Sequence, residues 1–224
     1  MKFHQTLQIA REESFEILNP EVVVTTLSSE ITLIESPDGK SHIKIFADSK
    51  KALELAELVE VVAKGEKLTI RADKKGRSFW GLDDGGLHGL SIELALPQVA
   101  NLKIKTVSGD IEINQTLANL EIDTLTSEVV INQNPSESCT VKTVSGSVAA
   151  HTFSGCEYKF KSISGDIKIH VAPDLAVEVD GNSLSGDLNS EIPLNENSEV
   201  SSGTGKVVAI KVSTISGDFN LVRN

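Results

Sequence analysis

Apolar and polar residues alternate in short runs along most of this chain, and the alternation changes phase at a recurring corner. Apolar residues take the even positions of 102–105 and the odd positions of 111–113, on either side of the segment TVSGD (106–110). An alternation of period two predicts a β-strand with one buried face. Because a straight strand cannot change its buried parity, TVSGD is predicted to be a bend between two strands.

The corner recurs at a nearly constant interval. Successive copies begin 18, 19, 19, 21 and 31 residues apart, and the last step contains an insertion at Pro193–Gly205. A unit of two short strands cannot bury an apolar face alone, so such units must stack on one another. The sequence therefore predicts an all-β fold, a parallel β-solenoid of roughly 19-residue coils. The copies open at Thr106, Thr124, Thr143, Ser162, Ser183 and Thr214, with a degenerate copy at Thr26.

The corner residues are predicted to be structural rather than catalytic or calcium-binding. A serine nucleophile needs one special site with a base, whereas this serine recurs in copy after copy. A calcium site needs several carboxylates close together, and each coil offers one acidic position, which Ser147 interrupts. Glycine permits unusual backbone angles, and Ser and Asp side chains can bond the turn's own amides. The corner residues are Ser108, Gly109, Asp110, Ser145, Gly146, Ser164, Gly165, Asp166, Ser185, Gly186, Asp187, Ser216, Gly217 and Asp218.

The first hundred residues are less regular. Strands are expected at 15–18, 21–27, 30–35 and 42–47, a short helix near 49–58, and a hairpin around 64–66. We expect this β-rich half, 1–100, to cap the regular repeats of 101–224 within one continuous domain.

The loop 73–90 is the most distinctive segment, with five glycines and the only tryptophan. An exposed aromatic beside acidic residues can stack on a sugar or contact a protein. Alternatively, the tryptophan folds back onto the end of the solenoid or the helix. The candidate contact residues are Phe79, Trp80, Asp83, Asp84 and His88.

A polar column after each corner places His151 and His170 on adjacent coils. Together with Asp166, the two imidazoles are candidate ligands for a transition metal. They can instead repel one another when protonated, or simply continue a solvated polar ladder. Cys139 and Cys156 are too few for a disulfide framework and are expected to be free, buried thiols.

Outward charges predict the stacking register, because opposite charges on neighbouring strands stabilise a sheet. Stacking in chain order places Lys103 and Lys105 over Glu121 and Asp123, Lys159 and Lys161 over Glu178 and Asp180, and Lys142 beside Lys161 as a like pair.

The composition narrows the classes of partner. The 224 residues carry a net charge of -11, which argues against nucleic acid and anionic lipid as partners. No apolar run has the length of a signal peptide or a membrane span, so a cytoplasmic location is expected for the chain as written. No cofactor fingerprint occurs, and none is expected.

The repeats resemble a bacterial family of β-strand-repeat proteins of unknown function that carry the label of candidate adhesins. The resemblance rests on the T-x-S-G-D corners, the strand LSIELALP (90–97) before the repeats, and the final coil at 203–221. It implies a β-helical, non-enzymatic domain, and many relatives are exported or tethered to the membrane. No catalytic residues are established for the family, so none is carried over.

The expected function is a structural or binding module that presents a surface to an unidentified protein or polysaccharide. Pairing of solenoid ends into a homo-oligomer is a further expectation. One alternative is a carbohydrate-binding or carbohydrate-active β-helix, although the repeats contain no arginine before Arg223. The other alternative, suggested by the family resemblance, is a component of envelope-stress regulation.

Overall fold

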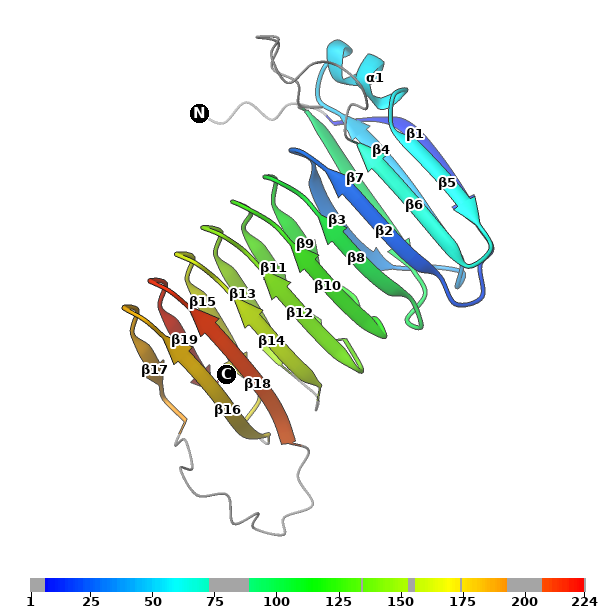
Figure 1. Ribbon diagram of the computed structural model, residues 1–224. Coiled ribbons are helices and arrows are strands. Elements are labelled where there is room, and N and C mark those ends of the chain that lie inside the picture. Colours follow the sequence, from blue (N-terminus) through cyan, green and yellow to red (C-terminus); the bar gives the residue numbers. More distant parts are fainter. Residues whose placement is uncertain are drawn as a thin grey trace.

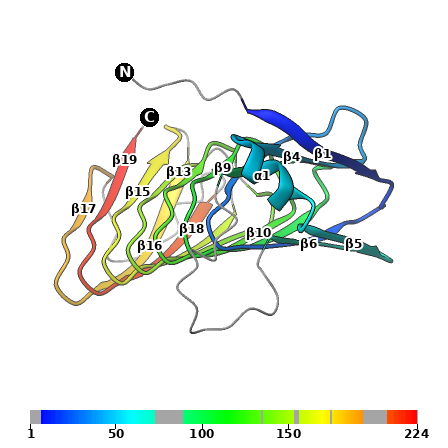
Figure 2. The same ribbon diagram turned by 90° about the horizontal axis from the view of Figure 1, so that it is seen from above.

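The computed structural model describes residues 7–72, 89–133, 135–152, 156–173, 175–192 and 207–223. This part of the chain forms two β-sheets and one short helix, α1 (Lys50–Ala56). Figures 1 and 2 show the sheets as two layers, which corners of the chain connect. The strands are β1 (Gln8–Phe15), β2 (Glu21–Thr26), β3 (Glu30–Glu35), β4 (Ser41–Ala47), β5 (Glu60–Lys64), β6 (Lys67–Ala72), β7 (Leu90–Leu96), β8 (Asn101–Lys105), β9 (Ile111–Ile113), β10 (Asn119–Asp123), β11 (Val129–Ile131), β12 (Ser138–Lys142), β13 (Val148–Thr152), β14 (Glu157–Lys161), β15 (Ile167–Val171), β16 (Ala176–Ser183), β17 (Leu188–Ser190), β18 (Val207–Thr214) and β19 (Phe219–Arg223).

One sheet has nine strands in the order β16-β18-β14-β12-β10-β8-β2-β6-β5, and the other has ten in the order β1-β4-β7-β3-β9-β11-β13-β15-β19-β17. A strand of the nine-stranded sheet is followed, after a corner, by a strand of the ten-stranded sheet. We call such a pair a rung. The rungs are β2–β3, β8–β9, β10–β11, β12–β13, β14–β15, β16–β17 and β18–β19.

Neighbouring rungs pair in parallel, with their apolar columns in register. Leu102 lies opposite Leu120, which lies opposite Cys139, which in turn lies opposite Tyr158. All four side chains are buried between the sheets. The expected almost entirely β fold, with parallel stacking of repeated strand pairs and one short helix, is therefore present.

The order of the rungs departs from the order of the chain at both ends. The last rung, β18–β19, lies between β14–β15 and β16–β17, and the first rung, β2–β3, lies between β6 and β7 on one side and β8–β9 on the other. The prediction of stacking in chain order is therefore wrong at these places. At the C-terminal end the packing gives a reason. Phe160 is paired with Val212, and Gly181 of β16, which offers no side chain to pack, lies one strand further in the same row.

One cluster of buried apolar residues runs through both halves of the chain, from Val22 to Leu221. At the N-terminal end α1 contributes Ala52 and Ala56 to this core. The hydroxyl of Ser49 accepts a hydrogen bond from the amide of Ala52 at 3.1 Å and caps the helix. Antiparallel strands β1, β4 and β5 complete this end.

The strands of the N-terminal half agree with the sequence pattern except at the first. The strand predicted at 15–18 is wrong, because β1 ends at Phe15 and pairs with β4 from Gln8 onward. The predicted hairpin is present: Lys64 pairs with Lys67 across a tight turn, in which Gly65 has φ 60°. This left-handed angle is one that glycine adopts at little cost.

Candidate functional site

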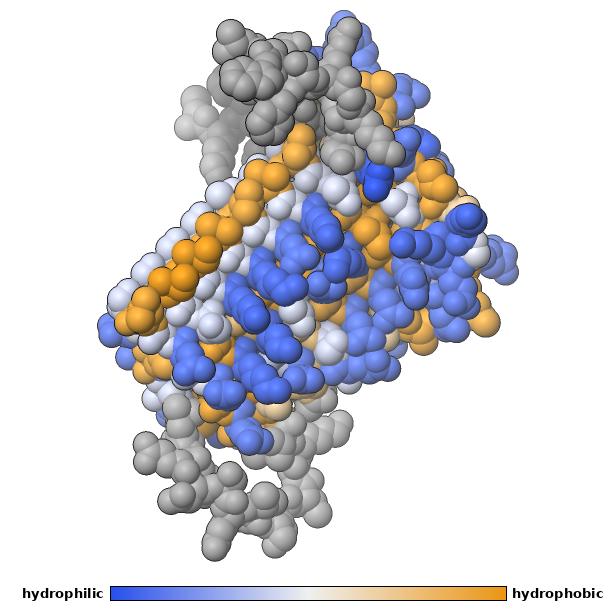
Figure 3. Space-filling model, in the orientation of Figure 1, coloured by the Kyte–Doolittle hydropathy of each residue, from blue (hydrophilic) through white to orange (hydrophobic). Residues whose placement is uncertain are grey.

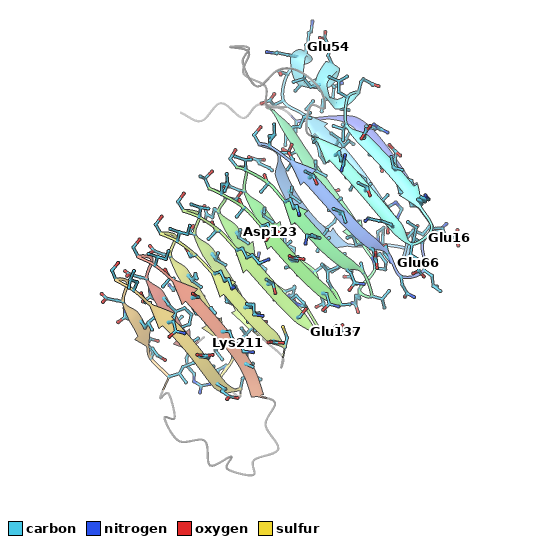
Figure 4. The ribbon with its side chains drawn as sticks, in the orientation of Figure 1. Glu16, Glu54, Glu66, Asp123, Glu137 and Lys211 are labelled. Carbon is cyan, nitrogen blue, oxygen red and sulfur yellow. The ribbon has the colours of Figure 1, made fainter. Side chains whose placement is uncertain are left out.

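The outward face of the nine-stranded sheet is strongly polar along β8, β10, β12, β14 and β18. Figure 3 shows this face, with hydrophilic residues spread across the strands. The outward positions alternate along each strand with the buried columns, as the pleat of a strand requires. They carry lysine, carboxylate, hydroxyl and amide side chains, and Figure 4 shows Asp123 and Lys211 among them.

On one half of this face Lys103 and Lys142 form ion pairs, whereas Lys105, opposite Asp123, forms none within the described residues. Lys103 Nζ lies 2.6 Å from a carboxylate oxygen of Glu121, and Lys142 Nζ lies 3.3 Å from Glu121 and 3.3 Å from Asp123. The hydrogen bond from Lys103, with a further one from Lys142, lowers the pKa of Glu121 below its usual range. The same contacts, led by the bond to Glu121, raise the pKa of Lys142. The predicted placement of Lys103 over Glu121 is confirmed.

On the other half two lysines have no acidic partner. Lys159 pairs across the sheet with Thr140 and Lys211, and Lys161 pairs with Lys142 and Ser213. Within the described residues, no carboxylate lies within ion-pairing distance of Lys159 or Lys161. We call Lys142, Lys159, Lys161 and Lys211 the lysine patch.

The lysine patch exists because of the rung order. The sequence predicts that Lys159 and Lys161 face Glu178 and Asp180, and this prediction is wrong. Strand β18 occupies the place beside β14, so Asp180 lies opposite Lys211 instead. Lys211 has one further carboxylate, Glu157, at 3.1 Å. The predicted like pair of Lys142 and Lys161 is confirmed.

A shallow depression of about 680 Å³ lies across this face. Its lining combines both halves of the charge pattern with hydroxyl and amide groups from β2, β8, β10, β12 and β14. This wide, open depression, whose lining also includes Val22, Leu102 and Leu120, suits an extended partner better than a small molecule, which proteins usually enclose. The polar lining includes Lys103, Glu121, Thr140, Lys142, Lys159 and Lys161.

The corner residues join the rungs to one another. The residue that opens a corner accepts a hydrogen bond from the amide three residues later, as from Gly146 to Thr143 at 2.9 Å and from Gly165 to Ser162 at 2.7 Å. The corner serine donates its hydroxyl to a carbonyl of the neighbouring rung. These bonds run from Ser108 to Leu27, Ser145 to Leu125, Ser164 to Val144, Ser185 to Ile215 and Ser216 to Ile163.

Close stacking of backbones explains the corner glycines better than unusual backbone angles do. Only Gly109 of the five has a positive φ, 103°. At Gly146, Gly165, Gly186 and Gly217, an added Cβ would overlap the carbonyl group of the corner in the adjacent rung. The corner aspartates also bond between rungs: Asp166 accepts the amide of Asp218 at 3.0 Å. The bonds of Ser and Asp therefore run mainly to the next rung, not to the turn's own amides as the sequence suggested.

An exposed apolar ladder follows the corners, and Figure 3 shows it as a continuous stripe along one edge. Its members occupy the second position of each T-x-S-G-D copy, which is aliphatic throughout. The sequence analysis did not predict this ladder, although an aliphatic residue at the second position of every copy could have indicated it. The exposed members are Val107, Leu125, Val144, Ile163, Leu184 and Ile215.

The predicted histidine ladder forms in part. The rings of His151 and His170 stack with centroids 4.5 Å apart and planes inclined by 12°. Asp166 lies before β15, whereas His170 lies near its far end, so the expected third ligand is about 13 Å away along the strand. Among the residues that the structure describes, no group of three His, Cys, Asp or Glu side chains could hold a metal ion.

The remaining sequence candidates lie elsewhere. Phe79, Trp80, Asp83, Asp84 and His88 fall outside the described residues. Both cysteines are free and buried, as the sequence predicts, and they lie beside the buried ring of Tyr158. Burial raises the pKa of the Cys139 thiol and raises that of Cys156 to about 11, so neither resembles an activated nucleophile.

The profile of the Toastrack family, DUF4097, matches residues 20–152 and, in a second overlapping match, residues 90–222. The chain belongs to the Toastrack family. The resemblance seen in the repeats is thereby confirmed. None of the curated proteins matches the chain. Within the described residues, no helix of this Toastrack protein is long and apolar enough to cross a membrane.

Several solved structures are similar to this chain at low sequence identity. A candidate cell adhesion protein from Clostridium sporogenes is similar with a TM-score of 0.50 and 10% identity, over 96% of this chain and 99% of that one. A candidate adhesin from Bacteroides fragilis has a TM-score of 0.49 and 13% identity, over 95% and 96%. A candidate lipid-binding protein from Parabacteroides distasonis has a TM-score of 0.45 and 13% identity, over 95% and 96%. At these identities the likeness concerns the fold alone.

Proposed function

We propose that this Toastrack protein is a non-enzymatic binding module, a β-solenoid of roughly 19-residue coils that contacts a partner through the outward face of its nine-stranded sheet. The observation that carries the proposal is the pair Lys159 and Lys161, which have no acidic partner within the described residues. Like charges directly opposite each other on neighbouring strands are destabilising, so this arrangement does not serve stability. A partner that neutralises the lysines gives the arrangement a use.

The non-enzymatic part of the proposal is supported by the repeated polar residues. Each corner serine donates its hydroxyl to a backbone carbonyl, and Asp166 and Asp218 each accept a backbone amide from the neighbouring rung. These groups already have structural partners, so they do not form a nucleophile and base held ready for a substrate.

Lysine acetylation footprinting tests the contact face even while the partner is unidentified. The intact protein is acetylated briefly, with and without an extract of the cells that make it, and each lysine is quantified by mass spectrometry. We expect protection of Lys159, Lys161 and Lys211, and none of Lys51 on α1 or Lys168 on the ten-stranded sheet. Equal protection of both sets, or none of either, would exclude this face as the contact surface.

A further inference from the structure

The lysine patch is a local reversal of the overall charge. The protein carries a net charge of -11, yet Lys142, Lys159, Lys161 and Lys211 gather on three adjacent strands. The side chains of Lys142 and Lys211 remain 45% and 52% exposed. Lysines close together and in contact with water attract an anion from solution, and the acidic remainder of the molecule discourages other copies from occupying the patch.

The groups around the patch suit a polyhydroxylated ligand. Thr140 and Ser213 hold outward positions on the same strands, and at the margin of the patch Ser138 donates a hydrogen bond to the Asn119 amide oxygen at 2.6 Å. Hydroxyl and amide groups can donate and accept hydrogen bonds with sugar hydroxyls. Lysine makes point-charge contacts with a carboxylate, while the forked geometry of arginine is absent from these strands.

The strand spacing supplies a matching repeat. Neighbouring strands lie about 4.8 Å apart, which is comparable to the length of one sugar unit in an extended polysaccharide. A chain that crosses the strands would meet Lys142 and then Lys161 in one outward row, and Lys159 and then Lys211 in the adjacent row. Carboxylates that recur at each sugar can therefore contact the rows in succession.

Other polyanions fit this face less well. Single-stranded nucleic acid binds on aromatic side chains, and the outward positions of β8, β10, β12, β14 and β18 carry none. An extended acidic peptide would gain backbone hydrogen bonds at a sheet edge, whereas these strands lie in the interior of the sheet. We propose that the lysine patch binds the carboxylates of an acidic polysaccharide, a chain of uronic-acid sugars lying across the strands. This proposal rests on the contact face proposed above and names its ligand class.

Glu121 acts as an internal competitor at the edge of the patch. Its carboxylate occupies Lys103 at 2.6 Å and Lys142 at 3.3 Å. Removing this charge frees Lys103 and leaves Lys142 with Asp123 as its remaining carboxylate partner. Removing Lys159 and Lys161 deletes the two lysines that have no acidic partner within the described residues. The two changes therefore shift the affinity in opposite directions.

The test measures binding of a fluorescently labelled polygalacturonate oligomer by anisotropy at low salt. Lys159→Gln/Lys161→Gln should weaken binding at least about tenfold, and Glu121→Gln should strengthen it about threefold. The matched controls carry the same charge changes elsewhere: Lys51→Gln/Lys168→Gln and Glu112→Gln should each stay within twofold of the parent protein. Binding should weaken in higher salt, because exposed charges are screened over about 10 Å at 0.1 M.

Several results would overturn the proposal. One is an equal loss of affinity for polygalacturonate in Lys159→Gln/Lys161→Gln and in its control Lys51→Gln/Lys168→Gln. Another is an unchanged affinity in Glu121→Gln. Equal binding of neutral dextran, or tighter lysine-dependent binding of polyglutamate or of phosphatidylserine vesicles, would assign the patch to another ligand class. Footprinting protection of Lys159 and Lys161 by cell extract without polygalacturonate binding would reject the polysaccharide and retain the contact face. If neither footprinting protection nor polygalacturonate binding is observed, both the contact face and the polysaccharide ligand are rejected.

Discussion

Gly165→Ala is the substitution that most directly probes how the rungs hold together. Gly165 lies in the stack of corners, next to Gly146 on one side and Gly217 on the other. An added Cβ would overlap the carbonyl group of Gly146, which is backbone and cannot rotate away. The rung must therefore shift, and the hydrogen bond that the amide of Gly165 donates to the hydroxyl of Ser162 at 2.7 Å lies within the part that moves.

The magnitude follows from the cost of overpacking. Forcing extra atoms into a close-packed site typically costs about 1–3 kcal/mol, and a clash with backbone belongs at the upper end. We expect Gly165→Ala to lower the free energy of unfolding by about 2–3 kcal/mol. For a chain of this size, each 1 kcal/mol lowers Tm by about 2–4 °C.

Gly181→Ala is the matched control. A Cβ there would meet the Leu188 and Val179 side chains at 3.5 and 3.9 Å, which is ordinary contact. Its unfolding free energy should stay within about 0.5 kcal/mol of the parent. The free energies of unfolding of Gly165→Ala and Gly181→Ala are measured by urea unfolding, which is followed by circular dichroism, and their m-values are compared. An equal effect in the two variants, or none in Gly165→Ala, would refute the close-stacking argument. It would show that this corner accommodates a Cβ, as the corner with Ser127 at the same position does.

Three further predictions concern polar groups. Thr143→Val keeps the shape but leaves the amide of Gly146 without its acceptor, so it should lower the free energy of unfolding in urea by about 1–3 kcal/mol. The control Thr140→Val, at a half-buried outward position, should lower it by less than about 0.5 kcal/mol. Lys103 and Lys142 lower the pKa of Glu121 in the folded protein. Ionised Glu121 therefore stabilises the fold at pH values above its unfolded-state pKa, near 4.5, and this stabilisation is lost as the pH falls through the folded-state pKa. Between pH 6 and pH 3, the free energy of unfolding should therefore fall by about 0.2–1 kcal/mol less in Glu121→Gln than in the parent protein. The same pH dependence in both proteins would contradict the ion pairs. Cys139 and Cys156 should resist iodoacetamide at pH 8 in the native protein and react in urea, whereas rapid native labelling of Cys139 would contradict its burial.

The local structure was predictable because the pattern that encodes it is local. The parity change around TVSGD places Leu102 and Ile111 on inward faces of different sheets, and both are buried. The charge pair of Lys103 with Glu121 followed from the 18-residue step between their strands. These features depend only on neighbours within one or two repeats.

The order of the rungs was not predictable from the same pattern. Every rung presents similar apolar columns, so the periodicity alone does not decide whether β16 or β18 adjoins β14. Packing against the bulky column of Tyr158 and Phe160 decides it, through Ile210 and Val212. The lysine patch depends on this choice, and sequence reasoning therefore assigned Lys159 and Lys161 to register rather than to binding. The repeat spacing predicts the histidine stack, but it does not bring Asp166 beside the rings, because His170 lies four positions further along the extended chain than Asp166.

Engineered disulfides test the central claim, that the last rung lies beside β14 and thereby leaves the lysine patch open. Lys161 and Ser213 lie on adjacent strands in register, about 4.8 Å apart at their backbones, while Asn182 is one strand further. A disulfide needs Cα atoms within about 7 Å. After mild oxidation and peptide mapping, Lys161→Cys/Ser213→Cys should form the cross-link in high yield, and Lys161→Cys/Asn182→Cys should not. The opposite outcome would show that the coils stack in chain order, with Lys161 beside β16, and would remove the basis for the patch.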